Sequence, residues 1–197
     1  MPVRTSQGFT LTELLFALAI GSVVMAGVVN FFINQQKHYN VREQVATMQE
    51  NTRMGLDFIS RDLAMAGYDP TETSGAGIVV ANASTLQVTM DLNGNGTTAD
   101  ADEDVTYTLY DHDKDGDQDL GRTVGGITEL IAENIATLSF AYTLADGTVT
   151  TTPADPSQIR AIDVTLTGRT ARPDPQYADG YRNVTLNTTI LVRNMAS

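Results

Sequence analysis

The first 33 residues constrain the fold of this chain more than any other stretch. A polar leader ends at Gly8, and an apolar run follows from Phe9 to Ile33 with a single charged residue, Glu13. At 1.5 Å per residue, about 25 helical residues span the hydrocarbon core of a bilayer. A carboxylate inside such a span costs roughly 2.5–3.5 kcal/mol on insertion scales, so Glu13 requires a functional reason and a partner.

Two other interpretations of the apolar run fit the sequence less well. A secretory signal peptide needs a cleavage site of small residues, and Ala17-Leu18-Ala19 could be forced into that role. The run continues past this point without a break, and the polar leader would then have no purpose. A plain membrane anchor has the right length but leaves Glu13 unexplained. The basic residues that flank the run, Arg4 before it and Lys37 and Arg42 after it, give only a weak signal for orientation.

The segment Gly8-Phe9-Thr10-Leu11-Thr12-Glu13 resembles the class III signal of type IV prepilins. In that family a membrane peptidase cuts after the glycine and methylates the new N-terminal residue. The glutamate, fifth in the mature chain, meets the N-terminal amine of a neighbouring subunit during assembly. The resemblance thus implies processing at Gly8 and Phe9, and an assembly role for Glu13 and Phe9. It also implies a single pass through the inner membrane with a periplasmic head, followed by transfer into a pilus at the cell surface.

The chain continues after Ile33 as an amphipathic helix. Apolar residues recur at intervals of three and four, at Val41, Val45, Met48, Thr52, Leu56, Ile59, Leu63 and Ala66. This pattern predicts one helix from Phe9 to Ala66, ended by Gly67 and Pro70. The expected organisation is a leader (1–8), a transmembrane and assembly half of the helix (9–33), an amphipathic half (34–67) and a β-rich head (68–197).

Beyond Gly67 the sequence changes to short β-rich runs separated by turn residues. Asp146-Gly147 predicts a hairpin turn, and 127–134 is interpreted as a short helical turn. The expected strands are 78–80, 85–90, 105–110, 136–144, 149–152, 159–167 and 181–192. A helix followed by antiparallel strands is an α+β arrangement. The resemblance implies a type IV pilin-like fold, in which the long N-terminal helix packs on an antiparallel sheet in the head.

Three later segments resemble the PilW-type minor pilins, which are related to the J pseudopilins of type II secretion. They are Arg61–Tyr68, Asp104–Leu109, and Ala132–Ile135 continuing into Leu138–Tyr142. The resemblance implies a low-abundance subunit that starts or caps a pilus. Its partners would be other minor pilins, the major pilin, prepilin peptidase and, before assembly, the inner membrane. Two alternatives stay open: a J-type pseudopilin of a secretion machine, and a membrane-anchored calcium-binding adhesin whose leader is not cleaved.

Composition and charge exclude several other classes. The net charge is −12, and ten of the 24 acidic residues lie between Asp91 and Asp119, opposed only by Lys114. Such an acidic head repels phosphate backbones, so no direct binding of nucleic acid is expected. The chain has no cysteine for a disulfide or a nucleophile. There is no Gly-x-Ser-x-Gly elbow, and the histidines are His38 and His112 alone, so we do not expect an enzyme.

The acidic region contains two segments with the ligand spacing of calcium loops. In the first, alternating carboxylates precede Gly116, and the predicted ligands are Asp111, Asp113, Asp115, the Asp117 carbonyl and Asp119. Arg122 stands at the twelfth position and cannot ligate. In the second, weaker segment the candidates are Asp91, Asn93, Asn95 and, at the twelfth position, Asp102, with help from Asp100 and Asp104. The sequence predicts Ca²⁺ as a structural cofactor and no other; the alternative for each segment is a solvated acidic loop.

Overall fold

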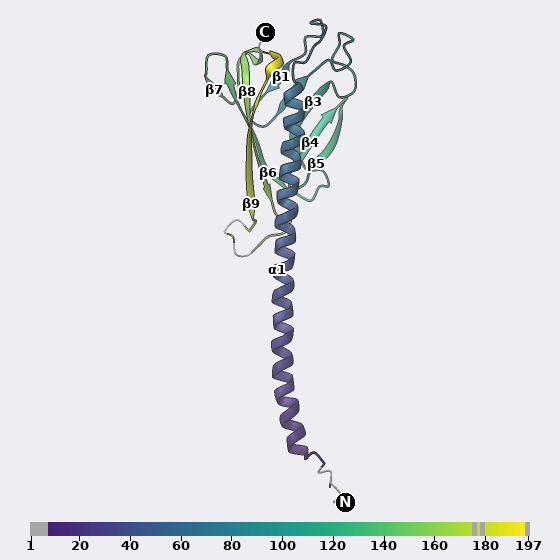
Figure 1. The fold of residues 1–197 in the computed structure, drawn as a ribbon, viewed down its shortest axis with the longest axis vertical. Helices are drawn as coiled ribbons and strands as arrows, with labels where there is room; N and C mark the ends of the chain where they lie inside the picture. Colours follow the sequence, from purple (N-terminus) through teal and green to yellow (C-terminus); the bar gives the residue numbers. More distant parts are fainter. Residues whose placement is uncertain (1–7, 175–176, 178–179, 196–197) are drawn as a thin grey trace, which may run out of the picture. The chain divides into compact units, whose positions relative to one another are not determined.

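The computed structural model describes residues 8–174, 177 and 180–195. The chain divides into two compact units, residues 1–43 and 44–197. One helix, α1 (Leu11–Met65), contributes to both units, and all the strands belong to the second (Figure 1). The helix confirms the expected element and differs from it by two residues at the start and one at the end.

The second unit contains two antiparallel sheets. In the first sheet the strands are ordered β1-β2-β3-β4-β5, and in the second the order is β7-β6-β8-β9. The first sheet comprises β1 (Ile78–Ala81), β2 (Leu86–Thr89), β3 (Asp104–Tyr110), β4 (Asp119–Val124) and β5 (Ile127–Ala132). The second comprises β6 (Ile135–Leu144), β7 (Val149–Thr150), β8 (Ile159–Arg169) and β9 (Asn183–Leu191). Short 3₁₀ turns, η1 (Pro156–Gln158) and η2 (Arg193–Met195), precede β8 and follow β9.

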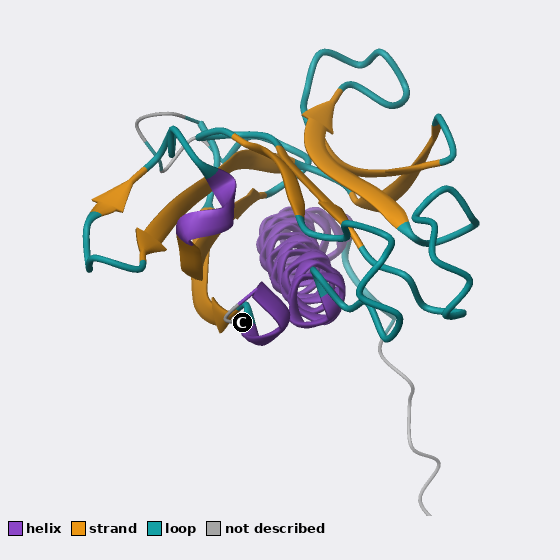
Figure 2. Ribbon diagram, turned by 90° about the horizontal axis from the view of Figure 1, so that it is seen from above, coloured by secondary structure: helices purple, strands orange, loops and turns teal. Residues whose placement is uncertain are grey.

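The part of α1 in the second unit packs against both sheets, whose strands curve around it (Figure 2). Its buried face repeats at helical spacing and consists of Met48, Thr52, Gly55, Ile59 and Leu63. These positions match the predicted stripe, except that Gly55 lies in its middle. A Cβ at Gly55 would lie 2.8 Å from Leu120 of β4 and 3.0 Å from Leu166 of β8, so the glycine allows the helix to approach both sheets.

Backbone hydrogen bonds also connect the two sheets directly. The Ile135 N–H at the start of β6 donates to the Gln118 carbonyl at 2.7 Å, and the Phe140 N–H donates to the Ala83 carbonyl at 2.9 Å. The buried Tyr142 hydroxyl donates to the Asn82 carbonyl at 2.8 Å. The second sheet is thus tied to the β1–β2 turn and to the residue before β4, and a single apolar core lies between the sheets and α1.

Gly67 ends the helix in the way the sequence predicts. Its φ of +75° is left-handed, which favours glycine, and its N–H donates to the Thr89 carbonyl at 3.0 Å. A Cβ at this position would lie 2.8 Å from Met195 Cγ. The helix terminus is therefore held against β2 and the C-terminal turn of the head.

Most predicted strands are confirmed within a few residues, but one region was predicted wrongly. Residues 127–132 form β5 and not a helical turn, and β4 over 119–124 was not expected. Gly125 and Gly126 both have positive φ and form a two-residue hairpin turn that pairs Val124 with Ile127. Gly125-Gly126 is a sequence signal for such a hairpin. It was not recognised because the residues before it were interpreted as part of an acidic loop.

Candidate functional site

The start of α1 is a capping box formed by Thr10 and Glu13. Glu13 Oε2 accepts hydrogen bonds from the Thr10 N–H at 2.9 Å and the Thr10 hydroxyl at 2.8 Å. In return, the Glu13 N–H donates to Thr10 Oγ1 at 3.3 Å. Thr10 is the N-cap, and Glu13 is the third helical residue, as this reciprocal motif requires. The sequence carries the signal as Thr-x-x-Glu, which the sequence analysis did not use.

The helix that follows the capping box is apolar on every side. All its large apolar side chains up to Ile33 are exposed, from Leu11 at 77% to Val28 at 43%. Among the described residues, α1 is the one helix long and apolar enough to cross a membrane, with a mean hydropathy of 2.2 in its most apolar window. An exposed helix that is apolar all round requires an apolar environment, which a membrane or a bundle of like helices provides.

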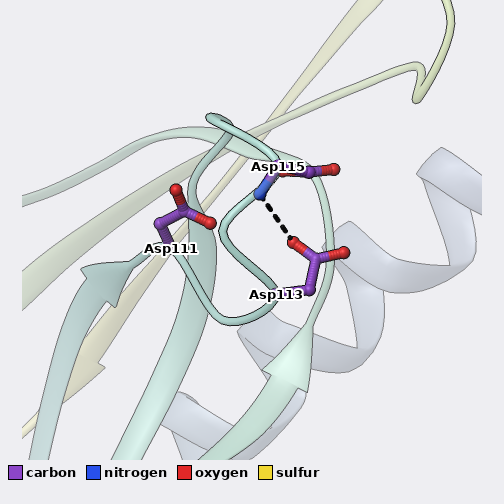
Figure 3. A group of neighbouring side chains, drawn as sticks. All are labelled: Asp111, Asp113 and Asp115. Atoms are coloured by element: carbon purple, nitrogen blue, oxygen red, sulfur yellow. Dashed lines mark hydrogen bonds between the residues drawn. The ribbon is translucent and has the colours of Figure 1, made fainter.

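The first predicted calcium segment forms the connection between β3 and β4. Carboxylate oxygens of Asp111, Asp113 and Asp115 lie within 4.8 Å of one another, and so do those of Asp113, Asp117 and Asp119. Figure 3 shows the first group, in which the Asp115 N–H donates to Asp113 Oδ1 at 3.3 Å. The structure therefore brings together the residues that the spacing predicted.

Several of these carboxylates already have partners within the protein. Asp117 forms an ion pair with Arg169 at 2.8 Å, and burial raises the pKa of Asp117. Asp119 accepts hydrogen bonds from the Asn134 N–H at 2.9 Å and the His112 N–H at 3.1 Å. The Asp117 N–H, by donating to Asp115, lowers the pKa of the Asp115 carboxyl. These contacts stabilise the loop without a cation, and calcium binding in this loop stays a prediction.

The second predicted segment, here called the 91–103 loop, connects β2 with β3. Asp91 is fully buried, and its carboxylate organises the turn that follows it. Asp91 Oδ1 accepts from the N–H groups of Gly94 at 2.7 Å and Asn95 at 3.1 Å, and Oδ2 accepts from the Gly96 N–H at 2.9 Å. The Thr71 hydroxyl is a fourth donor, at 3.4 Å. Both oxygens of Asp91 thus have donors.

The two asparagines of this loop converge on a different carboxylate, that of Asp100. The side-chain amide of Asn93 donates to Asp100 Oδ2 at 3.1 Å, and that of Asn95 donates to the same oxygen at 2.6 Å. The hydrogen bond from Asn95, and next that from Asn93, lowers the pKa of Asp100. Asp100 was expected to be only an auxiliary ligand.

Asp102 points to a partner outside the loop. Its carboxylate pairs with Arg122 of β4 at 3.1 Å, and its side chain is 63% exposed. The next residue, Glu103, is 1% exposed, and its Oε1 accepts hydrogen bonds from the N–H groups of Leu92 at 2.9 Å and Asn93 at 3.3 Å. The structure thus places Glu103, and not Asp102, against the loop backbone. The calcium-loop spacing predicted a ligand at the twelfth position, Asp102, and did not indicate Glu103 at the thirteenth.

Comparisons with known proteins bear on the N-terminal segment. Residues 3–29 match the family model described as the prokaryotic N-terminal methylation motif. No curated protein matches the chain. Among solved structures, a type IV-like pilin from Thermus thermophilus is similar to this chain. It shares 14% identity, with a TM-score of 0.49, over 76% of this chain and 98% of that one.

The methylation-motif match covers Gly8, Phe9 and Glu13, the positions to which the prepilin resemblance assigned processing and assembly. The matched segment includes much of the apolar part of α1, and together they support membrane anchoring and a pilin or pseudopilin role. The chain therefore carries, at its N-terminus, the methylation motif of prokaryotic prepilin-like proteins.

Proposed function

We propose that this chain is a minor pilin that takes part in starting or capping a type IV pilus. The observation that carries the proposal is the methylation motif over residues 3–29, which runs into a helix that is apolar and exposed on every side from Leu11 to Ile33. The helix would hold the precursor in the inner membrane and later pack among the helices of other pilins. The head, with its paired sheets and acidic loops, would distinguish this subunit from the one that forms the shaft.

Processing gives the first test. Prepilin peptidase should cut after Gly8 and leave an N-methylated Phe9 as the first residue of the mature chain. Mass spectrometry of the N-terminal peptide, from protein recovered from membranes and from sheared pili, measures both events. A mature chain that retains residues 1–8, or that begins after Ala19, would contradict the proposal.

The assembly role of Glu13 needs a test that separates charge from helix capping. Glu13→Gln keeps a side chain that serves a capping box but removes the carboxylate charge. Thr10→Ala does the reverse, because it removes the cap and keeps the charge. If the charge of Glu13 meets the amine of Phe9 on a neighbouring subunit, Glu13→Gln should insert in the membrane yet fail to co-purify with other minor pilins.

Thr10→Ala is the matched control for this experiment. It should lose about 0.5–2 kcal/mol of helix stability at the N-cap but still enter the complex. Equal loss of co-purification in the two variants would show that the capping box, and not the charge, matters for assembly. Normal co-purification of Glu13→Gln would remove the assembly role of Glu13.

A J-type pseudopilin is the second candidate, because the same methylation motif and apolar helix would serve it equally. Deletion of the gene separates the two functions: loss of surface pili with normal protein secretion supports the minor pilin, and the opposite result supports the pseudopilin. The third candidate is a calcium-binding adhesin anchored by an uncleaved leader. Detection of a mature chain that begins at Phe9 would exclude it.

A further inference from the structure

Glu103 is a buried acid with one oxygen left unsatisfied. Its side chain is 1% exposed, and Oε1 accepts the N–H groups of Leu92 and Asn93. The other oxygen, Oε2, is buried and has no hydrogen-bond partner among the described residues. A buried carboxylate oxygen without a partner is costly, so it needs a partner that the described residues do not supply, an ion or a water molecule.

Hydrogen bonds link Glu103, directly or through Asp100, to other polar residues of the same loop. Asn93 bridges two carboxylates, because its N–H donates to Glu103 Oε1 at 3.3 Å and its side-chain amide donates to Asp100 Oδ2 at 3.1 Å. The Glu103 N–H donates to the Asp100 carbonyl at 3.2 Å, which closes a turn between them. Asn95 reaches the same Asp100 oxygen at 2.6 Å. The amide oxygens of Asn93 and Asn95 each accept one loop N–H, from Asn95 at 2.9 Å and Thr97 at 3.0 Å, and each keeps a second lone pair. The two acids and the two amides thus form one hydrogen-bonded cluster.

Asp91 has a different task in this loop. Its two oxygens already accept four donors, three of them loop N–H groups, so it holds the turn through Gly96 in shape. Gly94 and Gly96 adopt positive φ angles of +72° and +81°, which bend the chain around this carboxylate. Asp91 is therefore a positioning residue, and the side chains of Asn93 and Asn95 are presented by the turn that it holds.

The donor set selects the kind of ligand. Carboxylate and amide oxygens suit a hard divalent cation, whereas zinc prefers the nitrogen and sulfur ligands that this cluster lacks. Ca²⁺ accepts six to eight oxygens in a flexible arrangement, whereas Mg²⁺ requires a near-ideal octahedron and retains several waters. Asp100 is exposed, so an ion can reach its carboxylate from solvent.

We infer that the 91–103 loop binds one Ca²⁺ through the carboxylates of Glu103 and Asp100 and the amide oxygens of Asn93 and Asn95. The site goes beyond the proposed role in pilus assembly, and it does not depend on that role. It replaces Asp102 with Glu103 as the acid that closes the loop. Two charged ligands are few, so the affinity should lie in the range of extracellular modules, on the order of 10⁻⁴ to 10⁻³ M.

The test is calorimetric titration of the full chain, purified in detergent micelles and freed of divalent ions with a chelator. The background variant Asp113→Asn/Asp115→Asn disrupts both carboxylate groups of the other acidic loop, because Asp113 belongs to each of them. In this background we expect one Ca²⁺ site and much weaker binding of Mg²⁺. Glu103→Gln and Asp100→Asn should each weaken calcium binding by at least about tenfold, since loss of even an indirect partner of a metal costs 10–100-fold.

Asp102→Asn is the matched control, because it removes the same charge from the same loop without touching a proposed ligand. It should leave the affinity within about threefold, as expected for a screened surface charge. Because Asp100 is exposed, Asp100→Asn tests the site even if Glu103→Gln fails to fold. The inference is overturned if the background protein binds no calcium, if Glu103→Gln or Asp100→Asn binds as tightly as the parent, or if Asp102→Asn weakens binding equally.

Discussion

Replacing Asp62 by alanine should strongly destabilise the head, because Asp62 joins α1 to two strands. Its Oδ2 accepts a hydrogen bond from the Tyr107 hydroxyl of β3 at 2.6 Å and another from Arg122 Nε of β4 at 2.8 Å. The Tyr107 side chain is fully buried, and that of Arg122 is 12% exposed. Burial and, next, the hydrogen bond to Asp62 raise the pKa of Tyr107, so its hydroxyl stays a donor.

The size of the effect follows from what Asp62→Ala leaves behind. The Tyr107 hydroxyl loses its acceptor, which costs roughly 1–3 kcal/mol for a buried polar group. Breaking a fully buried ion pair costs about 3–5 kcal/mol, but the Asp62 side chain is 20% exposed, and Arg122 keeps its second partner, Asp102, at 3.1 Å. We therefore expect a loss of about 3–4 kcal/mol in the free energy of unfolding, taken from the lower part of that range. For a chain of this size, the melting temperature should fall by roughly 6–16 °C.

Thermal unfolding followed by the near-ultraviolet circular dichroism of the tyrosines measures this loss, since the chain has no tryptophan. Tyr107→Phe removes only the hydroxyl and should cost about 1 kcal/mol. Asp102→Asn breaks the exposed pair and should cost less than about 1 kcal/mol. The double variant Asp62→Leu/Arg122→Met leaves no buried charge unpaired, since the Asp102 that loses Arg122 is exposed, and it should be more stable than Asp62→Ala. A double variant no more stable than Asp62→Ala, or a loss below about 1 kcal/mol in Asp62→Ala, would refute this reasoning.

Two further predictions concern close packing and pH. A Cβ at Gly168 would collide with Thr52 Oγ1 of α1, so Gly168→Ala should cost about 1–3 kcal/mol, and adding Thr52→Ala should recover part of it. Unfolding measurements on the single and double variants check this. Hydrogen bonds, chiefly from Ser74, hold the pKa of Asp69 below its ordinary value of 3.8. The stability from this carboxylate is present above pH 3.8 and lost as the pH falls below it, so melting curves of wild type and Asp69→Asn should converge at low pH.

The periodic parts of the fold could be predicted from the sequence. The apolar stripe fixed the face of α1 that packs on the sheets, and alternation located β8 and β9, because each pattern records which side chains are buried. The seam between helix and sheets could not be foreseen. Gly55 of α1 lies against β4 and β8, and Gly168 of β8 lies against α1. A glycine has no side chain, so it adds nothing to an apolar pattern. β4 was missed because Gly121 and Arg122 interrupt the alternation, and β5 was interpreted as a helical turn. The tertiary structure shows the roles of both β4 residues: Gly121 lies against Tyr110, and Arg122 pairs with Asp62.

For the candidate site residues, too, local contacts could be predicted from the sequence and long-range contacts could not. Spacing brought Asp111, Asp113 and Asp115 together correctly, because neighbouring residues in one tight loop must lie close. Spacing could not show that Asp102 forms an ion pair with Arg122 of β4 and is therefore not free to act as a ligand of its own loop. Nor could it show that Glu103 turns inward, since burial of a charged side chain depends on how β3 continues after the loop. Spacing in the local sequence predicts which residues cluster. Contacts with residues far away in the sequence determine which of the clustered residues remain free to bind a ligand.

The two acidic loops therefore rank differently by sequence and by structure. The sequence favours 111–119 because five aspartates alternate there, yet Asp113 and Asp115 are exposed, and water screens their charges at little cost. The 91–103 loop has fewer acids, and each loop has one buried carboxylate oxygen without a hydrogen-bond partner among the described residues, Asp111 Oδ1 and Glu103 Oε2. Asp111 is only half-buried, whereas Glu103 is 1% exposed, so the unsatisfied oxygen costs more in the 91–103 loop, roughly 1–3 kcal/mol for a buried polar group. Calcium at ten times Kd should stabilise the fold by about 1.4 kcal/mol, which raises the melting temperature by about 3–6 °C. We expect this rise to survive in Asp113→Asn/Asp115→Asn and to vanish in Glu103→Gln; the reverse outcome would show that charge density, and not burial, determines where the cation binds.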